Sequence, residues 1–223
     1  MNRWLLALAA AAALASHATA NADAGAGAGA VVLVYHQVAT DTPPSTSVTP
    51  QRFRRQLDHL DDNGFHVLAL EQILDRLESG RELPPDTIAL TFDDGYESVY
   101  TKAFPMLRKR GWPFTVFVTS DYVGSNGYLD WPQLREMAAA GADIGNHTRS
   151  HPYWVRKHRG EDRDTRRRRI RAEILDAQRR IERQVPDGAV RLLAHPYGEY
   201  DPLVEAVVTE LGFRAMGQHS GAL

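Results

Sequence analysis

The sequence predicts an α/β fold in which short parallel strands alternate with helices inside a single domain. Three observations lead to this prediction: short apolar runs recur, a helix-like stretch follows nearly every run, and glycines close several of the helix-like stretches. Strands joined by helices pair in parallel, and six or so such units favour a closed or distorted barrel over an open doubly wound sheet. The 223 residues suit one domain with its own core.

The first half of the chain shows the alternation most clearly. Phe53, Leu57 and Leu60 share one face of a helical segment that ends before Gly64, and Gly111 closes a later helix in the same way. The predicted elements are strand 31–35, helix 50–63, strand 65–70, helix 71–79, strand 87–92, helix 98–110 and strand 114–118.

The second half continues the pattern. Asp130 is expected to cap a helix that carries Pro132 in its first turn, and Gly212 ends the last helix. The predicted elements are helix 131–140, strand 142–145, helix 164–184, strand 190–194 and helix 202–211.

Composition excludes several classes of function. A formal net charge of -2 argues against bulk attraction to nucleic acid, and the absence of cysteine excludes disulfides, thiolate metal sites and thiol nucleophiles. The segment 156–183 is locally basic and could attract an anionic polymer. Its apolar stripe at Ile170, Ile174 and Ile181 instead favours a packed helix whose exposed charges are paired.

The N-terminus predicts export. Arg3 precedes an apolar stretch over 4–15 that is too short to span a bilayer, and 18–20 reads Ala-Thr-Ala, a small-residue cleavage signature. An N-terminal membrane anchor is the less favoured alternative. We expect the mature protein in the periplasm or outside the cell, as a monomer without stable membrane insertion. The predicted parts are a signal peptide at 1–20, a flexible Gly/Ala linker at 21–30 and a folded domain at 31–223.

Polar residues gather where the predicted strands end. In a barrel of parallel strands and helices, the C-terminal strand ends meet at one rim, where the chemistry of such folds lies. The residues at or just after these strand ends are His36, Asp93, Asp94, His147, His195 and Tyr197. The sequence therefore predicts a polar site at this rim.

Asp93 and Asp94 need a turn in order to serve one site, because consecutive strand residues point to opposite faces. Gly95 directly after them permits such a turn. The pair could instead cap the next helix, but His147 and His151, four residues apart in a compact loop, favour a metal site. Two imidazoles and one carboxylate leave coordination positions open for water and substrate, and the other carboxylate can take a proton from that water.

Two segments resemble the signature motifs of a known family. Residues 91–95 (Thr-Phe-Asp-Asp-Gly) and 147–151 (His-Thr-Arg-Ser-His) are similar to the first and second motifs of the polysaccharide deacetylases, also called NodB-homology proteins or family 4 carbohydrate esterases. The resemblance implies a distorted (β/α)7 barrel with Asp93 as general base. It also implies a divalent metal ion, with zinc preferred and cobalt, nickel or iron as alternatives. The implied ligands are Asp94, His147 and His151.

Two further segments resemble one particular branch of this family. Residues 34–38 (Val-Tyr-His-Gln-Val) and 193–199 (Leu-Ala-His-Pro-Tyr-Gly-Glu) are similar to the branch that deacetylates poly-β-1,6-N-acetylglucosamine, a biofilm exopolysaccharide. The resemblance implies that His36 is the general acid and that the main-chain N–H of Tyr197 binds the oxyanion. Two more residues that we expect to contact substrate are His195 and Trp131.

The chain departs from the family pattern at two points. Ala194 stands where the wider family carries an arginine that orients the base, so Asp130 loses its expected partner and receives no role. The chain stops at Leu223, where the family usually continues with a motif that carries a late histidine, and the biofilm branch with a glycan-hydrolysing domain. The predicted domain therefore leaves open a C-terminal truncation.

We expect a metal-dependent hydrolase that removes N-acetyl groups from poly-β-1,6-N-acetylglucosamine. Deacetylation of peptidoglycan or chitooligosaccharides is the close alternative, and a glycan-binding homologue that has lost catalysis is the second. A glycosidase that uses paired carboxylates comes last, because adjacent aspartates do not offer the separation that its chemistry needs. The lack of an activated Ser or Cys nucleophile predicts a reaction without a covalent intermediate.

Overall fold

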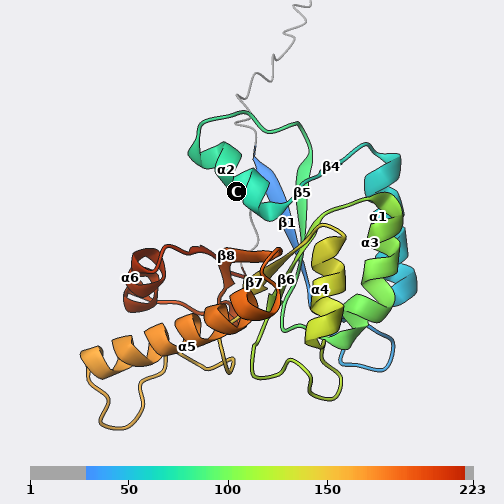
Figure 1. The fold of residues 1–223 in the computed structure, drawn as a ribbon. Helices are drawn as coiled ribbons and strands as arrows, with labels where there is room; N and C mark the ends of the chain where they lie inside the picture. Colours follow the sequence, from blue (N-terminus) through green and yellow to red (C-terminus); the bar gives the residue numbers. More distant parts are fainter. Residues whose placement is uncertain (1–28, 219–223) are drawn as a thin grey trace, which may run out of the picture.

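A seven-stranded parallel sheet forms the centre of the molecule (Figure 1). The computed structural model describes residues 29–218. The predicted signal peptide at 1–20 and the predicted linker up to residue 28 lie outside the described residues. In space the strands follow the order β1 (Ala30–Tyr35), β5 (Thr87–Phe92), β6 (Phe114–Val118), β7 (Ala142–Asn146), β8 (Ala189–Ala194) and β9 (Arg214–Met216), and β4 (His66–Val67) pairs with the start of β5.

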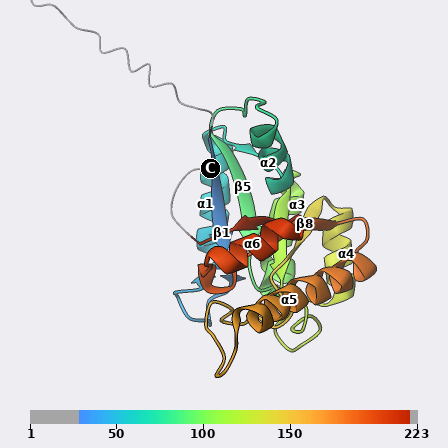
Figure 2. The same cartoon turned by 90° about the vertical axis from the view of Figure 1, so that its left-hand side faces the viewer.

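The sheet curls into a half-barrel without closing. β5 pairs along its whole length with β1, as Figure 2 shows, and its other edge pairs first with β4 and then with β6. Within residues 29–218 no ladder joins the two outer strands, β1 and β9, so a seam remains between them. The predicted α/β class and distorted barrel are therefore confirmed, and the sheet is open at one seam.

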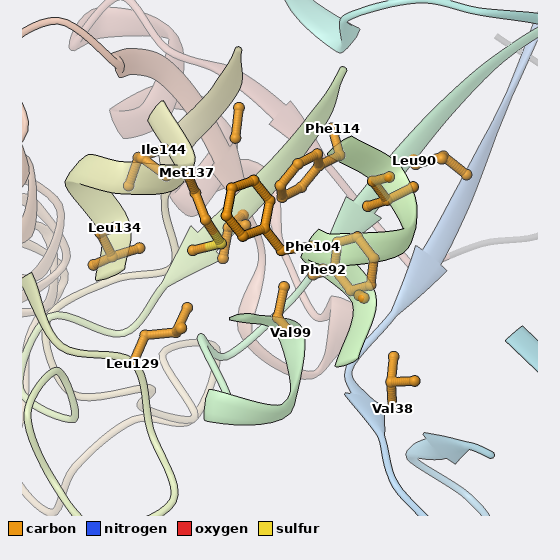
Figure 3. Close-up of a cluster of buried hydrophobic side chains, with 14 of the residues drawn as sticks. Val38, Leu90, Phe92, Val99, Phe104, Phe114, Leu129, Leu134, Met137 and Ile144 are labelled. Carbon is orange, nitrogen blue, oxygen red and sulfur yellow. The ribbon is translucent and has the colours of Figure 1, made fainter. Parts of the chain in front are cut away.

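Helices cover both faces of this sheet. Ile88, Leu90 and Phe92 point from β5 into a core shared with three helices on one side, whereas Ala89 points to the opposite face, where α2 packs. Figure 3 shows Phe92, Phe104 and Phe114 converging in the first of these cores. The helices on the side of this core are α1 (Pro50–Asp62), α3 (Phe104–Arg110) and α4 (Trp131–Ala139). The others are α2 (Leu70–Glu78), α5 (Arg163–Gln184) and α6 (Pro202–Glu210). α5 and α6 pack together in a third core, and Ile181 near the end of α5 also packs into the first core.

Side-chain caps explain where most of these helices begin. Asp130 accepts a hydrogen bond from the Gln133 N–H, and the Gln133 side chain accepts one in return from the Asp130 N–H, which forms a capping box at α4. At α5 the Asp162 side chain accepts from the Thr165 N–H, and at α6 the Asp201 side chain accepts from the N–H groups of Leu203 and Val204. The predicted cap at Asp130 is therefore confirmed.

Several predicted boundaries differ from the structure. The strand predicted at 65–70 is only two residues long, because Leu70 already begins α2 and packs into its core. The helix predicted at 98–110 starts with a π-helical turn, Val99–Ala103, before α3. Ala30, expected to end the linker, is the buried first residue of β1. Three strands escaped prediction because they are two or three residues long, namely β2 (Gln37–Val38), β3 (Ser47–Val48) and β9.

The basic residues of α5 are largely paired. The buried Arg166 guanidinium lies 2.6 Å from an Asp201 oxygen, and Arg169 lies 2.7 Å from Glu161. Arg167 also forms an ion pair, with Glu210 of α6. The prediction of a packed helix with paired charges is thus confirmed. None of the helices in the described part of the chain has both the length and the apolar character that crossing a membrane requires.

Candidate active site

The polar residues predicted at the strand ends do meet at one rim of the half-barrel. His36 follows β1, Asp94 follows β5, and His151 and Tyr197 follow β7 and β8. These residues line one pocket of about 390 Å³. The pocket is completed by Thr46, Tyr96, Tyr122, Tyr128 and Gln218.

The turn after β5 brings Asp94 out of the strand. Asp94 and Gly95 both have positive φ, at 71° and 81°, so the extended strand conformation ends where the sequence analysis predicted a turn. A side chain at position 95 would place its Cβ 3.2 Å from Val118 Cγ1, which explains why glycine is needed there. Asp93 stays almost fully buried, and its N–H donates to the Tyr35 carbonyl at 2.8 Å. The two carboxylates therefore occupy different environments.

Asp94, His147 and His151 form a cluster of three potential ligands. Asp94 Oδ1 lies 3.1 Å from His147 Nε2 and 3.3 Å from His151 Nε2. His147 Nδ1 donates to the Ala194 carbonyl at 2.9 Å, because a carbonyl only accepts, and this leaves Nε2 free to offer a lone pair. One proton can bridge only two of the three converging atoms, whereas a single cation can bind all three. The donor set of two nitrogens and one oxygen fits a divalent ion.

The protonation of Asp94 and His151 also suits a metal site. For His147, burial alone would lower the pKa, but the hydrogen bond to Asp94 and the charges of Asp93 and Asp94 together raise it. Burial, followed by the neighbouring His147, lowers the pKa of His151 to about 4, so the imidazole is neutral near pH 7. Burial alone would raise the pKa of Asp94, but His147 and His151 together hold it below its ordinary value. An ionised carboxylate and neutral imidazoles are the forms that bind metal ions.

The loop that carries the two histidines is held by buried polar groups. Asn146 Oδ1 accepts from the Thr148 N–H at 2.8 Å, and its amide donates to the Ile174 carbonyl at 3.0 Å. Glu173 of α5 accepts from the Ser150 N–H at 2.9 Å and from its hydroxyl at 3.1 Å. These contacts offset the strain of positive φ at Thr148 and His151.

Tyrosine side chains form the walls of the pocket. Tyr96 stacks on Tyr128 with 5.0 Å between ring centroids, and Tyr122 lies 5.0 Å from the Tyr128 ring. Tyr197 contacts His151 edge to face and stacks on Tyr153 at 3.7 Å. Sequence reasoning named Tyr197 alone, although Tyr96 directly follows the Asp-Asp-Gly motif and could have been found from that position.

Two residues expected to contact substrate lie away from the pocket. His195 is 2% exposed, and its Nε2 lies 3.0 Å from Glu205 Oε1 of α6, so it faces the neighbouring helix. Trp131 is the first residue of α4 and packs against the largest core cluster. The geometry does not support a substrate contact for either side chain. For His195 the reason is that a position at a strand end does not by itself decide which way a side chain points.

Comparison with known proteins assigns the chain to a family. Residues 80–216, more than half of the chain, match the profile described as polysaccharide deacetylase. The chain belongs to the polysaccharide deacetylase family. The solved structure of IcaB from Ammonifex degensii is similar to it, with a TM-score of 0.74 and 31% identity over 84% of this chain and 82% of that one.

Two curated relatives carry more specific names. The chain is 28% identical over 158 residues to the poly-beta-1,6-N-acetyl-D-glucosamine N-deacetylase of Staphylococcus epidermidis, covering 68% of this chain and 54% of that protein. It is 32% identical over 132 residues to the chitooligosaccharide deacetylase of Sinorhizobium fredii, covering 58% and 55%. The matches span from 21% to 55% of the length of the curated relatives.

Proposed function

We propose that this protein is a metal-dependent N-deacetylase that acts on a polysaccharide of acetylated glucosamine. The observation that carries the proposal is the cluster of Asp94, His147 and His151 next to a second, buried aspartate, with a half-buried His36 lining the same pocket as Asp94 and His151. A divalent ion held by the cluster would polarise the acetyl carbonyl and make a bound water more acidic. Zinc is the preferred ion, with cobalt, nickel or iron as alternatives.

The chain's own residues then perform the proton transfers. Asp93 removes one proton from a water whose oxygen bonds to the acetyl carbon, and the main-chain N–H of Tyr197 donates to the carbonyl oxygen as it gains charge. The C–N bond breaks, and His36 gives its proton to the departing nitrogen. Acetate and a free amine are the products, and no covalent bond to the protein forms.

The pocket suits a sugar substrate. Tyr96, Tyr128 and Tyr197 offer ring faces and hydroxyl groups, which pack on the apolar faces of sugar rings and bind their hydroxyls. Among acetylated glucosamine polymers we favour poly-β-1,6-N-acetylglucosamine, in line with the Staphylococcus epidermidis relative and the segments around His36 and Tyr197. Chitooligosaccharide or peptidoglycan deacetylation is the second candidate, in line with the Sinorhizobium fredii relative.

One assay tests the proposal. The protein is stripped of metal with a chelator, reloaded with zinc, cobalt or nickel, and offered β-1,6- and β-1,4-linked N-acetylglucosamine oligomers and peptidoglycan while acetate is measured. We expect metal-restored release that is fastest on the β-1,6 oligomers and is strongly reduced in Asp93→Asn, which should still bind metal. Release from the other substrates alone favours the second candidate. Glycan binding without acetate release would show a homologue that has lost catalysis.

We also propose that the chain is exported and acts as a monomer. The export part of the proposal rests on the charged, apolar and small-residue pattern over 1–20. Fractionation of expressing cells should place the protein outside the cytoplasm with its N-terminus at Asn21, and size exclusion should give the mass of one chain. A cytoplasmic protein that retains Met1 would contradict export.

A further inference from the structure

Gln218, just beyond β9, reaches the buried aspartate of the candidate site. Its side-chain nitrogen Nε2 lies 3.1 Å from Asp93 Oδ2 and 3.4 Å from His36 Nε2. A carboxylate can only accept, so the amide must present its N–H₂ group to Asp93, which also settles the orientation of the amide. This is the only hydrogen bond to the Asp93 carboxylate within the part of the chain that the structure describes.

Gln218 makes this contact across the seam of the half-barrel. β9 pairs with β8 and β1 pairs with β5, but no ladder between β9 and β1 exists within residues 29–218. His36 follows β1 and Asp93 follows β5, so the amide links the ends of three strands where the sheet itself leaves a gap. The contact is therefore a side-chain bridge at the rim.

Gly198 makes room for the start of this side chain. A Cβ at position 198 would lie 2.8 Å from Gln218 Cβ and 3.0 Å from its backbone nitrogen. Only glycine permits so close an approach, and its φ of +66° also favours glycine. The turn after β8 is thus shaped to seat Gln218, although the residue as a whole is exposed at the pocket edge.

We propose that Gln218 is a positioning residue for the general base, an inference that rests on the proposed deacetylase function. Asp93 is 2% exposed, so no bulk water is available to orient its carboxylate in place of a protein donor. The amide holds Oδ2 and leaves Oδ1 to accept the proton of the attacking water. The longer contact with His36 forms only when His36 Nε2 carries no proton, so Asp93 is the principal partner.

Two variants of Gln218 separate hydrogen bonding from packing. Gln218→Leu removes the donor, and Gln218→Glu keeps the shape but cannot donate to Asp93. Both should lower kcat about tenfold or more with little change in KM, because a hydrogen bond to a charged group contributes roughly one to two powers of ten in rate. Gln51→Leu, the same change at an exposed glutamine of α1, should keep the kcat of the parent.

Further measurements on the full-length protein make the test decisive. Calorimetric titration with zinc should give parent-like affinity for Gln218→Leu, since the residue contacts none of the three proposed ligands. In the Asp93→Asn background, Gln218→Leu should cause no additional loss of residual rate. An unchanged kcat in Gln218→Leu, an equal loss in the Asp93→Asn background, or lost zinc binding would overturn the inference while leaving the deacetylase proposal standing. A parent protein that releases no acetate from any substrate would overturn both.

Discussion

Asp143 offers a pH-dependent test of the fold that is independent of the candidate site. It lies within β7, and its Oδ2 atom is buried without a hydrogen-bond partner among the described residues. Burial, and then the charge of Glu71, raises the pKa of Asp143 from its ordinary 3.8 to about 6. The folded state therefore holds this proton more tightly than the unfolded chain does.

The sign and the size of the effect follow from that difference. Between pH 4 and 6 the Asp143 carboxyl binds more protons in the folded state than in the unfolded state, so its contribution to stability falls as the pH rises through this window and stays lower above it. A rise from 3.8 to about 6 corresponds to a loss of at most about 3 kcal/mol at pH 7. Asp143→Asn removes the charge at nearly constant shape, and should raise the free energy of unfolding by about 1 to 3 kcal/mol at pH 7.5 and hardly at all at pH 4.

Urea unfolding of parent and variant at the two pH values measures this difference. Asp41→Asn, the same change at an exposed aspartate, is the matched control and should shift stability by less than about 0.5 kcal/mol at either pH. A gain for Asp143→Asn of equal size at pH 4 and pH 7.5 would refute the reasoning, because a gain without pH dependence cannot come from the carboxyl charge.

Three further predictions concern the residues that support the site. Glu173→Gln should weaken zinc binding about tenfold in calorimetry and lower the free energy of unfolding in urea by roughly 1 to 3 kcal/mol. The reason is that an amide cannot accept all the hydrogen bonds that Arg149 and Ser150 donate to the carboxylate. Zinc affinity and stability equal to those of the parent would contradict this role. Gly95→Ala should lower stability by about 1 to 2 kcal/mol, since φ is +81°, and an unchanged melting temperature would count against it. Burial lowers the pKa of His195 to about 4, so the contribution of this residue to the stability of the metal-free protein should fall by up to about 3 kcal/mol as the pH falls from 6.5 to 4. His195→Leu should lose less over this window, and an equal loss would refute the assignment.

The lowered pKa of His195 needs a physical reason, because its Nε2 lies close to the Glu205 carboxylate. A neutral imidazole with its proton on Nε2 already donates to Glu205. A second proton would sit on Nδ1, which is buried and has no partner among the described residues. Protonation is therefore unfavourable despite the nearby carboxylate.

Much of the fold was predictable because strand and helix periodicity is local. The strands at 87–92 and 114–118 and the helix capped by Asp130 match the structure, since buried strands and caps leave strong signals over a few residues. The two- and three-residue strands were missed, because no period is visible in so short a run. The open seam was also unpredictable, since it depends on the curl of the whole sheet.

The candidate site was predictable only where motifs mark it. Asp94, His147 and His151 stand in compact motifs and converge as expected. His195 occupies a strand end, but its side chain faces Glu205 of α6, and the packing of that helix cannot be read from the strand itself. Gln218 carried no sequence signal, because its role depends on the approach of β9 to the end of β5 across more than a hundred residues.

The positive φ angles around the site have a consequence for the stability of the whole protein. Four of the five non-glycine residues in this conformation within residues 29–218 lie at the site, namely Asp94, Thr148, His151 and Tyr197. At roughly 1 to 3 kcal/mol each, their combined strain approaches the net stability of a typical domain, about 5 to 15 kcal/mol. The favourable interactions of the sheet and α5 must therefore exceed the net stability of the folded protein by about the amount of this strain. Selection for heat resistance alone would replace these four residues before it replaced residues of the core.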